Sequence, residues 1–498
     1  MPAIITNKFR MNNAEQFEES FSEATPTVYY LGIGRAQEFG TLTRPDARTE
    51  FEGTELLPTT PGDSVMNEFK NYDDLLAAKK ITGSNVSFVV PRRNWTTGTT
   101  YDIYRHDYEE FITGSTSTRQ TANSGATVLF DSTFYVMTGA RNVYKCLDNN
   151  NNSASTDEPT GTSTTVITTS DSYKWKYMYT LSASDQANFL STDFMGVTTD
   201  STVSAAAVDG SLDIVKIKTA GSSYTVSGGA TSGTITAVPI RGDGTGGVAS
   251  VTLTSGAITA VTITTRGSGY TFGYIRNADI LAATNAGGAG SGAELDVIIP
   301  PKGGHGFNAV EELGGFFVML NTSLEGTEST NSGDFTAAND FRKIVLIKDP
   351  QNAAGSAASA ATLRGTYAIR INSSPTPGTF TADEEINQAS TGAVGKVVEW
   401  DATNRILYYV QTRHNDAGAD ANGNVTAFSG TNVITGQSSS ATGTPEATTS
   451  TVNNVSFTSG YSAPELKHDT GEILYVENRT KITRATDQTE NIKLIIEF

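Results

Sequence analysis

The pattern of apolar and polar positions predicts two early helices with a strand between them. Apolar residues recur at three- and four-residue spacing from Met11 to about Glu23, as in a weakly amphipathic helix. The run Val28–Gly34 is rich in β-branched and aromatic residues and ends at glycine, which predicts a strand. A second helix is predicted over Asp63–Lys80, where Asp63 or Ser64 can serve as the N-cap.

Beyond residue 80 the pattern predicts mainly strands. The clearest is YKWKYMYTL (173–181), where every second position from Tyr173 to Tyr179 is aromatic, as in a half-buried strand with one aromatic face. The other candidates share short runs of apolar, aromatic and β-branched residues: 87–90, 127–130, 132–137, 142–147, 315–321, 341–350, 472–479 and 491–498.

Two regions rich in Gly, Ser, Thr and Ala contain internal repeats. IKTAGSSYT (217–225) returns as ITTRGSGYT (263–271). Further on, FTADEEINQASTGAVG (380–395) aligns with FSGTNVITGQSSSATG (428–443). Two copies are fewer than a solenoid needs, so each repeat predicts a small all-β module of paired units.

Together these patterns predict a mainly β, multidomain fold. We expect a β-sandwich-like core assembled from discontinuous segments, with a few short helices and two inserted all-β repeat modules. The N-terminal, second and C-terminal core segments would span 1–203, 301–372 and 457–498, and the modules would span 204–300 and 373–456.

Composition narrows the possible partners and the compartment. The 498-residue chain has a formal net charge of −18, which repels nucleic acid. The single cysteine, Cys146, excludes an intrachain disulfide framework. We find no signal peptide and no apolar run long enough to span a membrane. The chain is therefore expected to be made in a reducing cytoplasm.

Candidate catalytic and metal-binding chemistry is weak. Asp148 begins a calcium-like loop that lacks the required Gly and Glu, and the Asp-rich loop 414–424 is more typical of capped turns. Catalysis needs a base oriented by a carboxylate, yet residues adjacent in sequence usually point in different directions. The histidines, two of which have an adjacent aspartate, are His106, His305, His414 and His468. We expect no enzymatic activity, metal or cofactor.

The segment VVPRRNW (89–95) carries a candidate interface. Arg92, Arg93 and Trp95 belong to the residue types enriched at interface hot spots. The same residues also fit a solvated turn beside Pro91. The pattern alone favours neither interpretation.

The C-terminal stretch HDTGEILYVENRTKITRATDQTENIKLIIEF (468–498) closely resembles that of the homodimer-forming baseplate wedge subunit of T-even-type contractile-tailed bacteriophages. Other segments resemble the same family and occur in its order: ITNKFR (5–10), YLGIGRA (30–36), PGDSV (61–65), VVPRRNW (89–95), VYKCLD (143–148), DSYKWKYMYTL (171–181) and DFRKIVLIKDP (340–350). The resemblance leaves out the two modules, which look like insertions similar to decorations of marine phage structural proteins. A longer surface loop costs only about 0.6 kcal/mol per doubling of its length.

The resemblance implies a structural protein of the virion tail baseplate, assembled in the host cytoplasm and without enzymatic activity. Its implied partners are other wedge subunits and a second copy within each wedge, with no nucleic acid and no membrane insertion. The interface candidates are Arg92, Arg93, Trp95, Tyr475, Glu477, Asn478 and Arg479.

An alternative function belongs to a different class of protein. The chain could be a receptor- or glycan-binding tail accessory protein that uses its inserted modules for recognition. Aromatic side chains line many sugar sites, and the repeated Tyr224 and Tyr270 are the candidates for that role.

Overall fold

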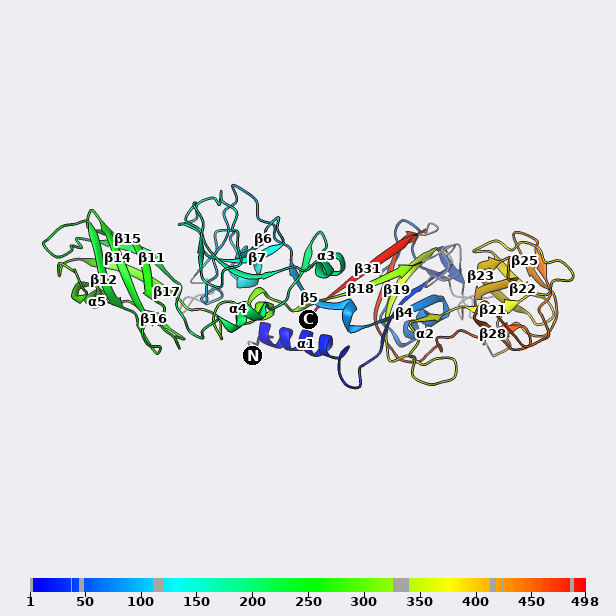
Figure 1. The fold of residues 1–498 in the computed structure, drawn as a ribbon. Helices are drawn as coiled ribbons and strands as arrows, with labels where there is room; N and C mark the ends of the chain where they lie inside the picture. The colour runs from blue at the N-terminus through cyan, green and yellow to red at the C-terminus, as the bar shows by residue number, and fades with distance from the viewer. Residues whose placement is uncertain are drawn as a thin grey trace. The chain divides into compact units, whose positions relative to one another are not determined.

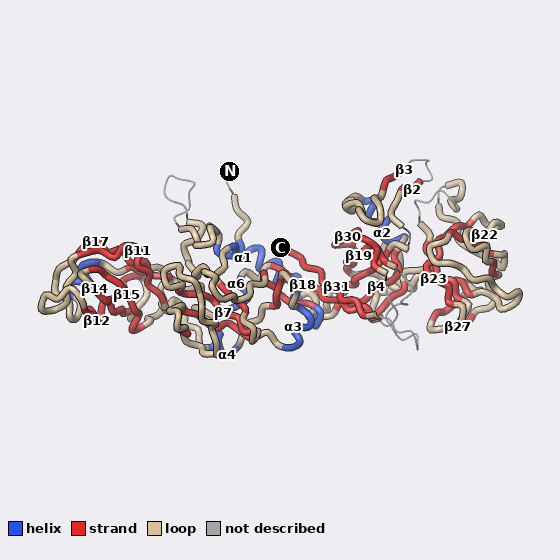
Figure 2. Tube along the Cα trace, turned by 90° about the horizontal axis from the view of Figure 1, so that it is seen from above, coloured by secondary structure: helices blue, strands red, loops and turns tan. Residues whose placement is uncertain are grey.

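The computed structural model describes residues 3–36, 38–43, 49–110, 120–325, 340–412, 418–422, 424–483 and 488–498. The predicted mainly β, multidomain fold is confirmed, because several antiparallel sheets outweigh the six α-helices of these ranges (Figures 1 and 2). Two compact units divide the chain: unit 1 holds Met1–Gln16, Ser87–Met319 and Ile495–Phe498, and unit 2 holds Phe17–Val86 and Leu320–Leu494. The unit boundaries fall in or beside α1 (Asn7–Glu19), β5 (Val86–Pro91), β18 (Phe317–Glu325) and β31 (Thr489–Glu497).

A five-stranded antiparallel sheet forms the centre of unit 2. Its strand order is β20 (Thr362–Arg364), β4 (Leu75–Ile81), β1 (Tyr29–Gly34), β19 (Phe341–Lys348) and β30 (Glu472–Ile482). Gly32 permits close packing here, because a Cβ at that position would lie 2.6 Å from the Val345 side chain. Segments from the beginning, middle and end of the sequence therefore share one sheet, which is visible in Figure 2 where β19, β30 and β4 lie together.

The predicted helix over Asp63–Lys80 is wrong beyond residue 73. Helix α2 covers Val65–Asp73, and the Ser64 side chain caps it by accepting the Asn67 N–H (3.3 Å). The run Leu75–Ala78 is buried and joins β4, which pairs with strands on both sides. Burial between two neighbouring strands thus overrides the weak helical pattern.

The second repeat forms part of a seven-stranded sheet in unit 2. The strand order is β26 (Thr442–Gly443), β25 (Ile434–Gly436), β22 (Glu385–Gln388), β23 (Ala393–Asp401), β24 (Ile406–Val410), β21 (Tyr367–Arg370) and β29 (Tyr461–Ser462). Ile386 pairs with Gly395 in the first copy as Ile434 pairs with Gly443 in the second. The aligned apolar positions of both copies meet in one buried cluster. Unit 2 also contains two small hairpins, β2 (Thr41–Thr43) with β3 (Thr49–Phe51) and β27 (Ser450–Val452) with β28 (Val455–Phe457).

In unit 1, a four-stranded sheet holds the strand with the aromatic pattern. The order is β6 (Tyr135–Met137), β7 (Asn142–Asp148), β9 (Lys174–Thr180) and β8 (Ile167–Thr168). The predicted half-burial of β9 is wrong, because residues 175–179 are buried on both faces and the Lys176 ammonium donates to the Thr164 carbonyl. The strand predicted over 127–130 is also wrong, because Leu129–Asp131 form a 3₁₀ helix.

The remaining elements of unit 1 include the first repeat. This region has two sheets and helix α5 (Asn277–Ala282). The strand order of the first sheet is β11 (Ile214–Ser222), β17 (Ser291–Ile298), β16 (Gly273–Tyr274) and β13 (Arg241–Gly242). The strand order of the second sheet is β12 (Gly233–Pro239), β14 (Val248–Thr254) and β15 (Ala257–Thr265). One buried cluster, drawn from residues 212–299, joins them. Outside this region lie β10 (Phe194–Gly196), which pairs with β5, and helices α3 (Ala183–Phe189), α4 (Ser201–Ala205) and α6 (Ala309–Leu313). The boundaries between the five segments predicted from the sequence stay a prediction.

Glu384 links the two copies of the second repeat. Its buried carboxylate accepts hydrogen bonds from the backbone N–H groups of Thr381 (2.7 Å), Ser438 (3.1 Å) and Ser439 (2.9 Å). Burial opposes ionisation of this carboxyl, but the hydrogen bonds from Ser439, Thr381 and Ser438 together outweigh it and lower its pKa below the ordinary value of 4.5. The folded state is therefore stabilised by the ionised form.

We expect Glu384→Gln to destabilise this part of unit 2 by about 1–3 kcal/mol. Because the folded pKa is depressed, the contribution is present above pH 4.5 and is lost as the pH falls through the folded pKa. Trp400, on β23, provides a local signal for urea unfolding in protein labelled with 5-fluorotryptophan. Glu385→Gln, at the neighbouring position, is the control. Equal losses in the two variants would contradict the prediction.

Candidate interaction surfaces

Strand β30 is the edge strand of the central sheet of unit 2. β19 pairs with one side of β30, which stands last in the strand order, so its other side faces away from this sheet. An edge strand presents backbone N–H and C=O groups to a possible partner chain. At 11 residues, β30 is longer than most strands. These features make it a candidate contact element.

Three of the interface candidates on β30, which are Tyr475, Glu477 and Arg479, form a polar row along one face of the strand. The Tyr475 hydroxyl donates to the Glu477 carboxylate (3.0 Å), which lies 3.9 Å from the Arg479 guanidinium. Burial raises the pKa of Tyr475 to about 12, and the nearby Glu477 charge adds to this effect. Charged side chains on an edge strand oppose indiscriminate pairing with other strands.

Asn478, the fourth of these residues, ties β30 to its own chain. Its amide Nδ2 donates to the Thr59 carbonyl (3.1 Å). The residue lines a polar hollow of about 200 Å³ together with Arg35 and Lys343. The Lys343 ammonium is held there by the Asp74 carboxylate, with an N–O distance of 2.8 Å. Asn478 therefore fixes the strand to the segment before α2.

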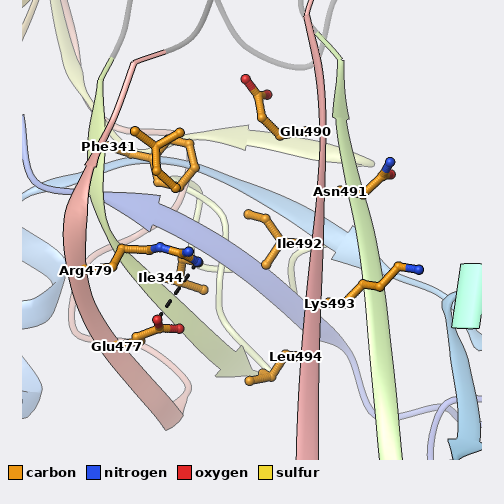
Figure 3. Close-up of a pocket in the computed structure, with 10 residues that line it drawn as sticks. Phe341, Ile344, Glu477, Arg479, Glu490, Asn491, Ile492, Lys493 and Leu494 are labelled. Atoms are coloured by element: carbon orange, nitrogen blue, oxygen red, sulfur yellow. Dashed lines mark ion pairs between the residues drawn. The ribbon is translucent and has the colours of Figure 1, made fainter. Parts of the chain in front are cut away.

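A groove lies between β30, β19 and β31 (Figure 3). Its cavity volume is about 490 Å³. Figure 3 shows Ile492 and Leu494 of β31 pointing into the groove, towards the side that carries Ile344. Glu477 and Arg479 line the same groove. The groove is thus lined by apolar side chains together with charged and polar ones, including the Glu477–Arg479 ion pair.

An exposed apolar surface lies where α2 approaches β30. The side chains of Val65 (73% exposed), Met66 and Phe69 on α2 and of Leu474 (47% exposed) on β30 reach solvent. The start of α2 and residues 472–476 of β30 enclose a hollow of about 560 Å³. We name Val65, Met66, Phe69 and Leu474 the α2/β30 surface. Val65 and Leu474 line this hollow together, and exposed apolar patches commonly mark protein–protein contacts.

Arg92 and Arg93 follow β5 and are half-buried against their own chain. The Arg93 guanidinium donates to the backbone carbonyls of Ser132 and Phe130 and lies over the Tyr135 ring, 4.6 Å from its centroid. Arg92 donates to the Ser191 carbonyl (2.7 Å). Both arginines thus hold loops of unit 1 in place, which the sequence could not reveal.

Trp95 is also bound within unit 1. Its indole N–H donates to the buried Ser155 hydroxyl (3.1 Å), and its ring packs beside the cluster that contains Tyr101 and Trp175. Arg92, Arg93 and Trp95 therefore all donate hydrogen bonds to loops of their own unit. Their role at a subunit interface stays a prediction.

Tyr224 and Tyr270, the candidates for sugar contact, are buried in the core of the first repeat. The Tyr270 hydroxyl donates to the Ile240 carbonyl and accepts the Gly247 N–H, both at 3.0 Å. The Tyr224 hydroxyl donates to Asn277 (2.5 Å). A ring buried on all sides cannot stack on a ligand, so the choice of these two tyrosines is wrong.

The residues weighed for calcium binding or catalysis have other partners. Asp148 pairs with Lys216 (2.8 Å) and lies 3.9 Å from Lys174. His106 accepts the Ile299 N–H (3.3 Å), and desolvation lowers its pKa. His414 and Asp416 lie outside the described residues, and Asp420 of the same loop accepts the backbone N–H groups of Asn422 (2.8 Å) and Asn424 (2.9 Å). Within the described residues, no group of three or more His, Cys, Asp or Glu side chains is placed to hold a metal ion.

Comparison with known proteins adds no family assignment. No protein-family model matches the chain, and a search of curated proteins finds no match. The resemblance to baseplate wedge subunits therefore rests on the sequence segments quoted above.

The contacts of Arg93 predict a measurable role in the stability of unit 1. Arg93→Ala should lower the free energy of unfolding by about 1–3 kcal/mol, because two backbone carbonyls lose a charged donor. Arg92→Ala should cost less, because its guanidinium reaches one backbone carbonyl and Asn94. The ¹⁹F signals of fluorinated Trp95 and Trp175 in urea would report the difference. An Arg93→Ala variant as stable as wild type would refute this role.

Proposed function

We propose that this protein is a structural component of a contractile phage tail baseplate wedge, where it mediates contacts between subunits. Its partners are other wedge subunits and a second copy of the chain, and it works without catalysis. Its place is the virion baseplate, after assembly in the host cytoplasm. This assignment of place and partners rests on the ordered series of family-like segments.

The observation that best supports a contact function is the α2/β30 surface. It combines exposed apolar side chains with a long edge strand, so a partner could gain both apolar burial and backbone hydrogen bonds. Obligate interfaces often bury more than about 2,000 Å². The hollow between α2 and β30 provides a concave site for a protruding side chain.

The charge of the chain supports protein partners over nucleic acid. A net charge of −18 repels phosphate groups, and the charged residues that line the hollow between α2 and β30 are all acidic. No helix among the described residues has the length and apolar character needed to cross a membrane. Contact between folded proteins requires neither a positively charged surface nor a membrane-spanning helix.

Two substitutions test the proposal on the α2/β30 surface. Val65→Asp and Leu474→Asp should each weaken association with co-expressed wedge subunits at least tenfold, since each places a charge in an apolar contact. Asp at the first turn of α2 suits the helix dipole, so Val65→Asp should leave the fold intact. Val433→Asp, at a residue that is 49% exposed and lies in the second repeat, is the control.

Analytical ultracentrifugation of the chain alone and with the wedge subunits would measure both kinds of association. The proposal would be refuted if wild-type protein bound no wedge subunit, or if the two surface variants assembled as well as Val433→Asp. An electron-microscopy map of a complete tail with this chain traced in it would test the location directly.

A further inference from the structure

Two exposed aromatic side chains lie on one edge of the first repeat. Phe272 is 54% exposed and Tyr274 is 46% exposed. Phe272 lies in the bend just before β16, and Tyr274 is the last residue of that strand, so the two residues stand two positions apart in sequence. In the short β13–β16 ladder, Tyr274 pairs directly with Arg241. Among the described residues of 204–300, the other large apolar residue with comparable exposure is Val208.

An arginine–carboxylate cluster adjoins these aromatic residues. The buried Asp279 carboxylate, in the first turn of α5, accepts two hydrogen bonds from Arg241 (3.2 and 2.8 Å) and two from Arg276 (2.7 and 2.9 Å). Both arginines use Nε and Nη2 in these contacts. The Nη1 groups of two well-exposed side chains therefore remain outside the pairing, where they can donate to a ligand.

A second carboxylate balances the charge of this face. Asp243 lies beside Phe272 and accepts the backbone N–H groups of Thr271 (2.9 Å) and Phe272 (3.3 Å). The positive charges of the two arginines are thus balanced by the negative charges of two aspartates. The cluster offers planar donors and acceptors without net charge, and the rest of the chain is strongly acidic. An anionic ligand would therefore gain little here.

We propose that Phe272, Tyr274, Arg241 and Arg276 form a binding site for an uncharged saccharide. The apolar C–H face of a sugar ring would lie on the two aromatic rings. Its hydroxyl groups would accept hydrogen bonds from the guanidinium Nη1 groups and donate to the Asp243 carboxylate. The site uses exposed residues of β13 and β16, of the bend before β16 and of the segment after it, and it shares no residue with the α2/β30 surface.

Saturation-transfer NMR on the full chain tests the site, because it detects weak binding. The probes are maltohexaose, cellohexaose and mannohexaose, with trigalacturonate as the acidic comparison. Wild-type protein should bind at least one neutral probe, and Tyr274→Ala and Phe272→Leu should each weaken that binding at least tenfold. Lys218→Ala, which removes an exposed cation paired with Glu294 in the same repeat, should bind like wild type.

Arg276→Gln separates ligand binding from folding. Asp279 keeps its contact with Arg241 in this variant, so the repeat should remain folded while saccharide binding falls. The proposal is overturned if no neutral probe binds, if trigalacturonate binds more tightly than all neutral probes, or if the aromatic variants bind like Lys218→Ala. Variants that lose association with wedge subunits but keep saccharide binding would also overturn it and assign this face to protein contact.

Discussion

The pairing of β19 with β1 and β30 is the constraint on which the organisation of unit 2 depends. It joins strands that begin at Tyr29, Phe341 and Glu472. Two charged residues at the start of β19 are buried: Arg342 bonds to Glu55 (3.0 Å), and Lys343 bonds to Asp74 (2.8 Å). A slip of one residue would exchange the two faces of the strand and separate these charges from their partners. Buried pairs of this kind add little net stability, but here they penalise other registers.

The two repeats differ in how their two copies are built into the fold. In the first, Gly221 and Gly267 are 46 residues apart, like Tyr224 and Tyr270, and each glycine lies against the tyrosine of its own copy. Both glycines have a φ of +64°, a conformation that favours glycine. In the second, corresponding strands of the two copies pair with each other, β22 with β25. In both repeats the apolar core also takes in residues from outside the two copies, such as Ile369 and Leu407 beside the second repeat.

Sequence patterns predicted the strands whose apolar runs are unambiguous, such as β1, β7, β9 and β19. They failed where an apolar run fits two structures, as at Leu75–Ala78, whose place in a sheet depends on partners distant in sequence. The four-residue spacing of Val65 and Phe69 is typical of an inward-facing helix stripe, yet both side chains are exposed and α2 buries Tyr72 instead. Which apolar residues a short helix leaves exposed depends on tertiary packing, so this candidate site could not be predicted.

The same limit applies to charged and aromatic candidates. Residue type indicated that Arg93 could meet a partner, but a guanidinium is equally suited to the backbone carbonyls of its own chain. Tyr270 and Tyr274 lie four residues apart, and one is buried while the other is exposed. Glycines leave room for the Tyr270 ring in the core, because a Cβ at Gly247 would lie 2.7 Å from its hydroxyl. Neighbouring glycines that are distant in sequence thus allow Tyr270 to be buried, and residue type alone could not reveal this.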